Sequence, residues 1–356
     1  MAQINKPNEY FNTITWSGDS SSPKTFTVGF QPDLIWGKLR NTAYNHQLYD
    51  SVRGFGNNKD LQSSATTAEG GGTADLYGYI SGTTSTGFTA TKGSDATADG
   101  YGYWNESGRT YVAWNWLGAN GTASNTDGSI TSTVSANTTS GFSIVSYTGT
   151  GSNATVGHGL GTSDIGTIIV KNRDSGTDNW WVFHKSIGAT GGLKLNATDS
   201  TITASTLWND TAPTSSVFSI GTGSGLNASG QDLIAYVMAE KKGFSKFGSY
   251  TGNGSTDGTF VYTGFKPAWV MVKRTTNLGG WVIYDNKRDS YNVTDLFLYA
   301  DTSDADVPFT GYDFLSNGFK ARTTGGAMNS SGDTFIYMAF AENPLVGTNN
   351  IPATAR

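Results

Sequence analysis

The 356-residue chain contains no cysteine, and few of its residues are charged. Without cysteine there is neither a disulfide framework nor a thiolate zinc site, and the redox state of its compartment is left open. Charged residues make up 14% of the chain, the net charge is -5 and the isoelectric point is about 5.2. Binding to nucleic acid requires a clustered basic face, whereas the lysines and arginines here are scattered. We therefore expect no nucleic-acid partner.

Long apolar runs are also absent. No stretch approaches the roughly 18 apolar residues that suggest a membrane-spanning helix. Residues 1–7 lack the apolar segment of roughly 7 to 15 residues found in a secretory signal peptide. The sequence thus predicts no membrane association and no signal peptide. A protein of this kind that acts outside a cell would leave by another route, such as the release of virions by lysis.

Glycine and aromatic residues are abundant, with 47 Gly, 10 Trp, 17 Tyr and 18 Phe. Disordered chains are poor in aromatics, and side chains of this kind bury a great deal of surface. Apolar residues alternate with polar ones at Phe26, Val28 and Phe30, as in a strand with one buried face. The run at residues 168–170 is apolar on both faces, which is typical of a central strand. We predict an all-β protein whose helices are few and short.

Two stretches of the chain repeat each other at a constant offset. The offset is 102 residues for each of three landmarks, which are Lys171 and Lys273, Glu240 and Glu342, and Phe142 and Phe244. Units of about 100 residues have the size of independent domains, whereas solenoid repeats run roughly 20 to 50 residues. The chain therefore contains a duplicated domain-sized unit.

A more divergent copy precedes these two. Gly29-Phe30-Gln31-Pro32 matches Gly264-Phe265-Lys266-Pro267, and beyond it Lys38, Asp50 and Arg53 match Lys273, Asp285 and Arg288. We predict a first copy at residues 1–120, a connector rich in Gly, Ser and Thr at 121–138, a second copy at 139–241 and a third at 242–344. The polar tail at 345–356 has no strand pattern, and we expect it to be an arm that docks on a neighbour.

Each copy contains six or seven short apolar runs separated by turn signals such as Asn317-Gly318 and Ser331-Gly332. This pattern predicts three tandem β-sandwiches that are similar to jelly rolls. A second arrangement stays open. Because residues 240–243 lead from the second copy into the third with almost no linker, the copies could share one larger prism or barrel with approximate threefold symmetry.

Motifs for catalysis are lacking. The three histidines, His46, His158 and His184, form no H-E-x-x-H pattern, and no G-x-S-x-G is present. His184 takes the position of Asp50 and Asp285, which favours a polar strand end. Glu240 and Glu342 occupy equivalent strand ends and so favour a shared structural role. We predict that the protein is not an enzyme and has no cofactor. Loops at 125–128 and 253–257 have calcium-like composition, but Asx turns explain them equally well.

Tyr101, Tyr103 and Trp104 lie in a glycine-rich segment of the first copy that has no counterpart in the other two. Exposed aromatics on turns stack on sugar rings or on the apolar surface of a partner, so these three are the candidate glycan or partner contact. The competing interpretation is that they fill a gap peculiar to the first copy. Trp180 and Trp281 align with each other before a strand and are expected in the core or at a sheet edge.

Short sequence motifs lie in order along the chain, at residues 29–33, 111–116, 141–149, 249–254, 264–267 and 337–342. Together they resemble the repeated modules of structural proteins of marine tailed bacteriophages, often described as tail-fibre-like. The resemblance covers about residues 9–344. It implies a virion component and brings no catalytic residues with it.

From these observations we expect a non-enzymatic bacteriophage structural protein, exposed on the virion as a tail fibre, a receptor-binding protein or a capsid decoration component. Its expected partners are other virion proteins in the tail or capsid, with a host surface glycan as a further candidate. Phage fibres are commonly trimers, so we also predict a homotrimer, assembled in the host cytoplasm. The rival interpretation is a carbohydrate-active enzyme or a free glycan-binding lectin, which would need two carboxylates in an aromatic-lined groove.

Overall fold

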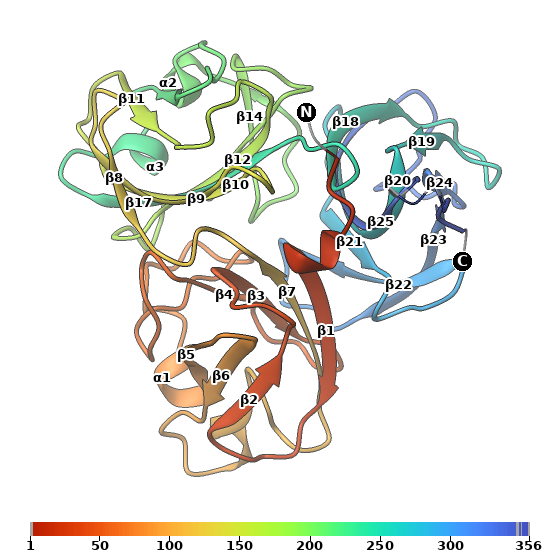
Figure 1. The fold of residues 1–356 in the computed structure, drawn as a ribbon, viewed down its shortest axis with the longest axis horizontal. Coiled ribbons are helices and arrows are strands. Elements are labelled where there is room, and N and C mark those ends of the chain that lie inside the picture. The colour runs from red at the N-terminus through yellow and green to blue at the C-terminus, as the bar shows by residue number, and fades with distance from the viewer. Residues whose placement is uncertain (1–2, 347–348, 350, 355–356) are drawn as a thin grey trace.

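The computed structural model describes residues 3–346, 349 and 351–354, and it is an all-β protein, as predicted. Figure 1 shows three lobes that meet at a common centre, one for each copy of the repeat. Helical segments are short: η1 (Pro7–Glu9), α1 (Ala74–Tyr77), η2 (Ala98–Tyr101), α2 (Ser205–Trp208) and α3 (Ser224–Asn227). No helix among the described residues is long and apolar enough to cross a membrane.

The first copy consists of a four-stranded sheet and a smaller outer sheet. The main sheet has the order β1 (Phe11–Ser17), β7 (Thr110–Trp116), β3 (Leu34–Leu39) and β4 (Gln47–Asp50). The outer sheet has the order β2 (Lys24–Thr27), β6 (Gly87–Thr91) and β5 (Tyr79–Thr84). Apolar side chains from both sheets, such as Ile35 and Phe88, form a core between the two layers. This copy is a sandwich.

The second copy has an eight-stranded sheet of order β15 (Ile202–Thr203), β14 (Gly191–Lys194), β13 (Trp181–His184), β12 (Ile165–Asn172), β17 (Asp232–Ala239), β10 (Phe142–Thr148), β9 (Ser132–Asn137) and β8 (Ala123–Asn125). Its outer layer is the pair β11 (Ala154–Gly157) and β16 (Val217–Ile220), together with α2 and α3. Ile168 and Phe218 lie in the core between these layers.

The third copy is one curved sheet of order β18 (Ser245–Thr251), β25 (Thr334–Pro344), β20 (Phe265–Arg274), β21 (Trp281–Asp285), β22 (Thr294–Tyr299), β23 (Val307–Leu315), β24 (Gly318–Ala321) and β19 (Phe260–Tyr262). The sheet curls so that β23 and β24 contact β20 from the other side of a core. Tyr284 and Phe314 lie in that core. Curling therefore replaces the separate outer sheet of the other copies.

Four strands have the same order and register in all three copies, namely β1-β7-β3-β4, β10-β17-β12-β13 and β18-β25-β20-β21. At one level of the sheet Trp36 pairs with Trp114 and Leu48, Ile169 with Tyr236 and Val182, and Met271 with Met338 and Ile283. Two residues further along the strand stand Lys38, Lys171 and Lys273. The repeat read from the sequence is therefore also a repeat of backbone pairing.

One face of each four-stranded sheet is turned toward the centre of the molecule. A single apolar cluster there takes side chains from all three copies, among them Trp36, Ile169 and Met271. Ile4 belongs to the same cluster, and its backbone N–H donates to the carbonyl of Lys242, so the N-terminal segment lies against the third copy. Each copy thus has its own outer core, and the three share an inner one. The structure therefore combines the two arrangements left open by the sequence, namely separate sandwich domains and one larger body with approximate threefold symmetry.

The predicted connector at residues 121–138 is wrong. This segment forms β8 and β9, which extend the main sheet of the second copy through pairing of β9 with β10. Ile130 and Val134 are buried there. Gly, Ser and Thr dominate the segment, but two apolar side chains on one face are enough to hold an edge hairpin against a core. The second copy therefore includes β8 and β9, and its first strand begins at Ala123.

Candidate functional site

Each copy is joined to the next by the same set of contacts, so that the three junctions close a ring. In each junction the backbone N–H of a loop residue donates to a carbonyl at the end of a central strand of the next copy. These bonds run from Glu69 N to Arg173 O, from Thr201 N to Thr275 O and from Asp306 N to Arg40 O, at 2.8, 3.0 and 2.6 Å. The first copy is joined to the second, the second to the third, and the third back to the first.

A second ring of hydrogen bonds comes from three side chains at one repeat position. The ring nitrogens of His46, Trp180 and Trp281 contact the carbonyl oxygens of Tyr299, Gln62 and Lys194 at 2.9, 2.8 and 2.8 Å. Each bond joins two copies. Trp180 and Trp281 are fully buried, which confirms that they are core residues. The sequence did not reveal His46 as their counterpart, because the first copy places a different aromatic ring there.

Two of the junctions each have a buried ion pair beside them. Arg53 Nε lies 2.5 Å from Asp50 Oδ2, and Arg288 Nε lies 2.6 Å from Asp285 Oδ2, with all four side chains fully buried. Burial acts to raise the pKa of Asp285, but the adjacent Arg288 outweighs it and holds the pKa below its usual range. Both ion pairs are therefore internal to the molecule and shielded from solvent.

The same carboxylates also bind the neighbouring copy. Tyr236 donates to Asp50 at 2.8 Å, and the indole of Trp114 donates to Asp285 at 3.0 Å. In the second copy His184 replaces the aspartate, and its Nε2 lies 3.1 Å from the carbonyl oxygen of Tyr337 in the third copy. The polar strand ends inferred from the sequence, Asp50, His184 and Asp285, therefore make hydrogen bonds to the neighbouring copies.

Three equivalent lysines are buried near the same junctions. Burial lowers the pKa of Lys38 to about 7, and lowers those of Lys171 and Lys273 to about 8. The ammonium of Lys171 donates to the carbonyl of Thr66, and that of Lys273 donates to the carbonyl of Thr198, in each case across a junction. The role of Lys171 and Lys273 is structural, because backbone carbonyls of the preceding copy are among their acceptors, whereas Lys38 donates to the carbonyl of Leu39 in its own copy.

The aromatic segment of the first copy does not form an exposed platform. Tyr103 and Trp104 retain 5% and 1% of their surface exposure and belong to the outer core of this copy. The Trp104 ring packs directly on Gly37 in β3, where an added Cβ would lie 2.3 Å from the ring. The expectation that these two residues are exposed is therefore wrong, because the short outer sheet leaves space that they fill.

Tyr101, the third residue of this segment, is half-buried. The ammonium of Lys92 lies 5.5 Å from the centre of its ring. A contact between Tyr101 and a glycan or a partner protein stays a prediction.

The two loops of calcium-like composition contain Asx turns, in which Asp127 N donates to Asn125 Oδ1 and Ser255 N donates to Asn253 Oδ1.

A hollow of about 260 Å³ lies where the second copy passes into the third; we name it the junction groove. Its walls include Asp164, just before β12, and Glu240, at the end of the second copy. Lys242, Lys246, Tyr262 and Gly264 of the third copy complete them. Tyr262 is 57% exposed. No sequence pattern indicates this groove, because its residues are up to 100 positions apart, from Asp164 to Gly264, and belong to two copies.

Two carboxylates converge at the junction groove. Lys185 Nζ lies 3.1 Å from Asp164 Oδ1 and 2.8 Å from Glu240 Oε2, and Glu240 also pairs with Lys246. Burial acts to raise the pKa of Glu240, but the two lysines outweigh it and hold the pKa below its usual value. Glu240 is therefore held as an anion that accepts hydrogen bonds.

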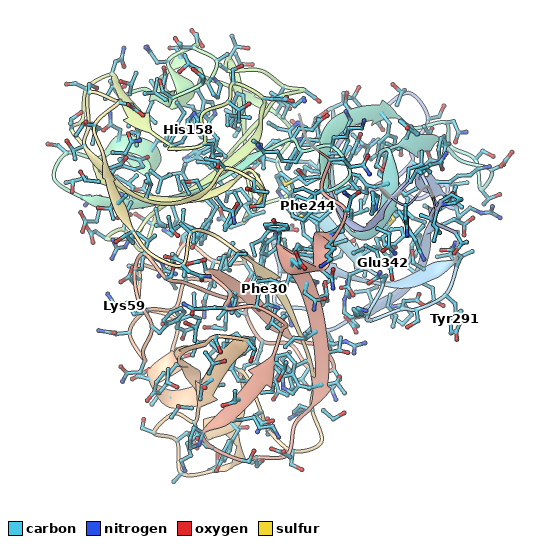
Figure 2. The ribbon with its side chains drawn as sticks, viewed as in Figure 1. Phe30, Lys59, His158, Phe244, Tyr291 and Glu342 are labelled. Atoms are coloured by element: carbon cyan, nitrogen blue, oxygen red, sulfur yellow. The ribbon has the colours of Figure 1, made fainter. Side chains whose placement is uncertain are left out.

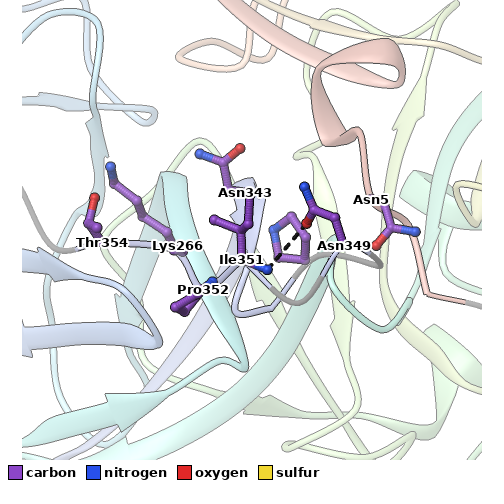
Figure 3. Close-up of a pocket in the computed structure, with 9 residues that line it drawn as sticks. Asn5, Lys266, Asn343, Asn349, Ile351, Pro352 and Thr354 are labelled. Atoms are coloured by element: carbon purple, nitrogen blue, oxygen red, sulfur yellow. Dashed lines mark hydrogen bonds between the residues drawn. The ribbon is translucent and has the colours of Figure 1, made fainter.

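A larger hollow, of about 450 Å³, lies beside the C-terminal segment (Figure 3). Lys266 and Asn343 line it together with Asn5 and described residues of the tail. The tail folds back on itself here, since Ala353 N donates to the carbonyl of Leu345 at 2.8 Å. Residues 347, 348, 350, 355 and 356 of the predicted arm lie outside the described part of the chain. Docking of the arm on a neighbour stays a prediction.

Fold and junctions together define a class: an all-β protein in which three sandwich-like copies close into a ring within one chain. The chain belongs to the family described as "Domain of unknown function (DUF7483)", whose profile matches residues 6–344. The match spans all three copies. No match was found among curated proteins or among solved structures.

Proposed function

We propose that this protein is a non-enzymatic structural component of a bacteriophage particle, exposed as a tail fibre, a receptor-binding protein or a capsid decoration component. The sequence resemblance to structural modules of marine tailed phages supports the viral setting. The observation that carries the structural role is the closed ring of junctions, in which Glu69, Thr201 and Asp306 make one repeated backbone contact.

A ring of this kind favours a load-bearing role for a physical reason. Each copy is held by both of its neighbours, so no copy can separate without breaking two junctions and exposing the shared apolar core. The buried pair of Asp50 and Arg53 is fully engaged in structural contacts, with the backbone of its own copy and with Tyr236 of the next. The architecture suits a compact body that keeps its shape on a particle surface.

The expected homotrimer is part of this proposal, as are tail or capsid proteins as partners and assembly in the host cytoplasm. The threefold arrangement inside one chain gives an alternative way to match a threefold site on a particle with a single copy. Light scattering of the purified protein distinguishes the two, since a mass of three chains supports the homotrimer and a mass of one chain contradicts it.

Location on particles tests the main proposal. Purified virions are digested for quantitative mass spectrometry, and gold-labelled antibodies against the chain are imaged on intact particles. Label at the tail tip supports attachment, and label over the head supports decoration. Absence of the chain from purified infectious particles would contradict the proposal.

The rival function is glycan binding without a virion, or glycan cleavage. The junction groove favours binding over cleavage, because a general acid needs a carboxyl group whose pKa is raised, and that of Glu240 is lowered by Lys185 and Lys246. A polysaccharide degradation assay tests this assignment. Release of reducing ends by the wild-type protein, lost in Glu240→Gln, would establish an enzyme.

A further inference from the structure

We infer that the junction groove binds an acidic saccharide, whose sugar ring stacks on Tyr262 and whose anionic group contacts Lys242. This inference deepens the attachment role and rests on the proposed function for the biological source of the ligand. The chemistry of binding is argued from the groove alone.

Tyr262 provides an aromatic face at a place where the repeat has none. The equivalent residue of the second copy is Gly157, because Gly157 pairs with Val217 as Tyr262 pairs with Gly318, and Tyr262 is 57% exposed. An added Cβ on Gly264 would lie 3.6 Å from the Tyr262 hydroxyl, so the tyrosine ring lies close to the backbone of Gly264. A large aromatic ring in this position loses little entropy on binding, and it presents an apolar face beside a polar tip. Internal packing does not account for it.

The polar walls of the groove suit hydroxyl groups. Glu240 and Asp164 accept hydrogen bonds, while Lys246 and Lys242 donate them. Each oxygen of Glu240 is used by one lysine, Oε1 by Lys246 and Oε2 by Lys185, and each keeps a second lone pair for a ligand. A sugar hydroxyl both donates and accepts, so it can use both kinds of wall. A simple anion would instead meet two carboxylates, and a simple cation would meet the lysines.

The charge balance favours an anionic sugar over a neutral one. Lysines 241, 242 and 246 line the groove against the two carboxylates of Asp164 and Glu240. Lys242 is exposed, and its side chain makes no ion pair or hydrogen bond with any described residue. It is the cation with charge to spare for a ligand carboxylate or sulfate.

The size of the groove limits what it holds. Small-molecule sites usually measure roughly 300 to 1,000 Å³, and this one has about 260 Å³. One sugar ring fits, and further rings of an oligosaccharide would lie outside, across the rim. We therefore expect recognition of a single acidic residue within a glycan.

Calorimetry with the intact chain tests the inference. The probes are a tetrasaccharide of alternating glucuronate and N-acetylglucosamine, a 6-sulfated galactose tetrasaccharide and neutral N-acetylglucosamine tetrasaccharide. We expect at least one acidic probe to bind about tenfold more tightly than the neutral probe. The first two probes distinguish a carboxylate from a sulfate. Equal binding of all three, or binding of none, would overturn the inference.

Variants localise the site. Tyr262→Ala should weaken binding of the acidic probe about tenfold, and Lys242→Ala should remove the preference for acidic over neutral probes. Tyr291→Ala is the matched control, because Tyr291 is an exposed tyrosine of the same copy and lies at its outer edge, far from Phe244 near the groove (Figure 2). Unchanged binding by Tyr262→Ala would sink the inference.

Failure of the two proposals can be told apart. If Tyr262→Ala enters particles normally but loses glycan binding, both proposals are supported. If the wild-type chain binds the acidic probe and is absent from particles, the virion role alone is wrong. If the chain is on particles and binds no acidic probe, the groove assignment alone is wrong.

Discussion

The hydroxyl of Tyr236 in the second copy donates a 2.8 Å hydrogen bond to Oδ2 of Asp50 in the first copy, and this oxygen also contacts Arg53. Tyr236 and Asp50 are 186 residues apart in the chain. The bond links the ion pair of one copy to the central strand of another, and Asp285 makes the equivalent contact with Trp114. Removal of the single hydroxyl oxygen of Tyr236 therefore tests how much this hydrogen bond contributes to the stability of the junction.

Tyr236→Phe removes only the hydroxyl and leaves the ring in the shared core. We expect the free energy of unfolding to fall by about 1.5 to 3 kcal/mol, the range for a hydrogen bond to a charged group. Urea unfolding followed by tryptophan fluorescence measures it. Tyr291→Phe is the control, since Tyr291 is 80% exposed. An unchanged midpoint for Tyr236→Phe would show that the junction bond does not contribute.

Lys38→Met should stabilise the protein at neutral pH. Burial lowers the pKa of Lys38 to about 7, whereas an unfolded lysine titrates near 10.5. Between these values the unfolded chain binds more protons, so wild-type stability rises with pH across that window. Methionine removes this penalty, and we expect a gain of about 2 to 4 kcal/mol at pH 7. The gain should shrink toward pH 10.

Thermal unfolding of Lys38→Met and wild type at pH 7 and pH 10 checks this prediction. Lys6→Met serves as control, because Lys6 is exposed in a surface pair with Glu9 and its replacement should leave stability nearly unchanged. Equal stability of Lys38→Met and wild type at pH 7 would mean that burial of this ammonium costs little.

His184 should make the junction between the second and third copies sensitive to acid. Burial, with a smaller contribution from Lys185, lowers its pKa to about 4 against the opposing bond to the carbonyl of Tyr337. The unfolded histidine titrates near 6.5. The contribution of His184 to the free energy of unfolding is therefore fully present above pH 6.5. This contribution is lost as the pH falls toward 4, and the total loss is roughly 3 kcal/mol.

Urea unfolding of wild type and His184→Gln between pH 7 and pH 4 measures that contribution. The variant should be less stable at pH 7, and its stability should fall less steeply with acid than that of wild type. Parallel pH profiles for the two proteins would contradict a role for His184 in the acid response.

Trp104→Ala should behave as a core mutation. The side chain is 1% exposed and packs on Gly37, Tyr49 and Phe88. We expect a loss of about 3 to 5 kcal/mol, as for other buried aromatic deletions, whereas Tyr101→Ala in the same segment should cost much less. Differential scanning calorimetry checks both. A Trp104→Ala protein of normal stability that fails to adsorb to host cells would restore the contact hypothesis.

Much of the local structure follows from the sequence. Alternation at Phe26 and Val28 and the doubly apolar run at residues 168–170 predict their strands, because a side chain's direction in a strand depends on its parity. The constant offset between Lys171 and Lys273 predicts equivalent positions in the register, and the alignment of Trp180 with Trp281 predicts that both lie in the core or at a sheet edge. Tyr103 and Trp104 could be read either way, since pattern does not state what covers an aromatic.

What the sequence by itself determined is which residues alternate into strands and how often the unit recurs, because these depend on neighbours along the chain. Tertiary structure alone decided what each buried face packs against. The ring of junctions and the meeting of Tyr262 with Glu240 and Lys242 arise from contacts between residues far apart in the chain. A repeat in the sequence does not state which residues of different copies meet. The hairpin β8–β9 escaped detection for the same reason: its few apolar residues become a strand only against a core that other segments supply.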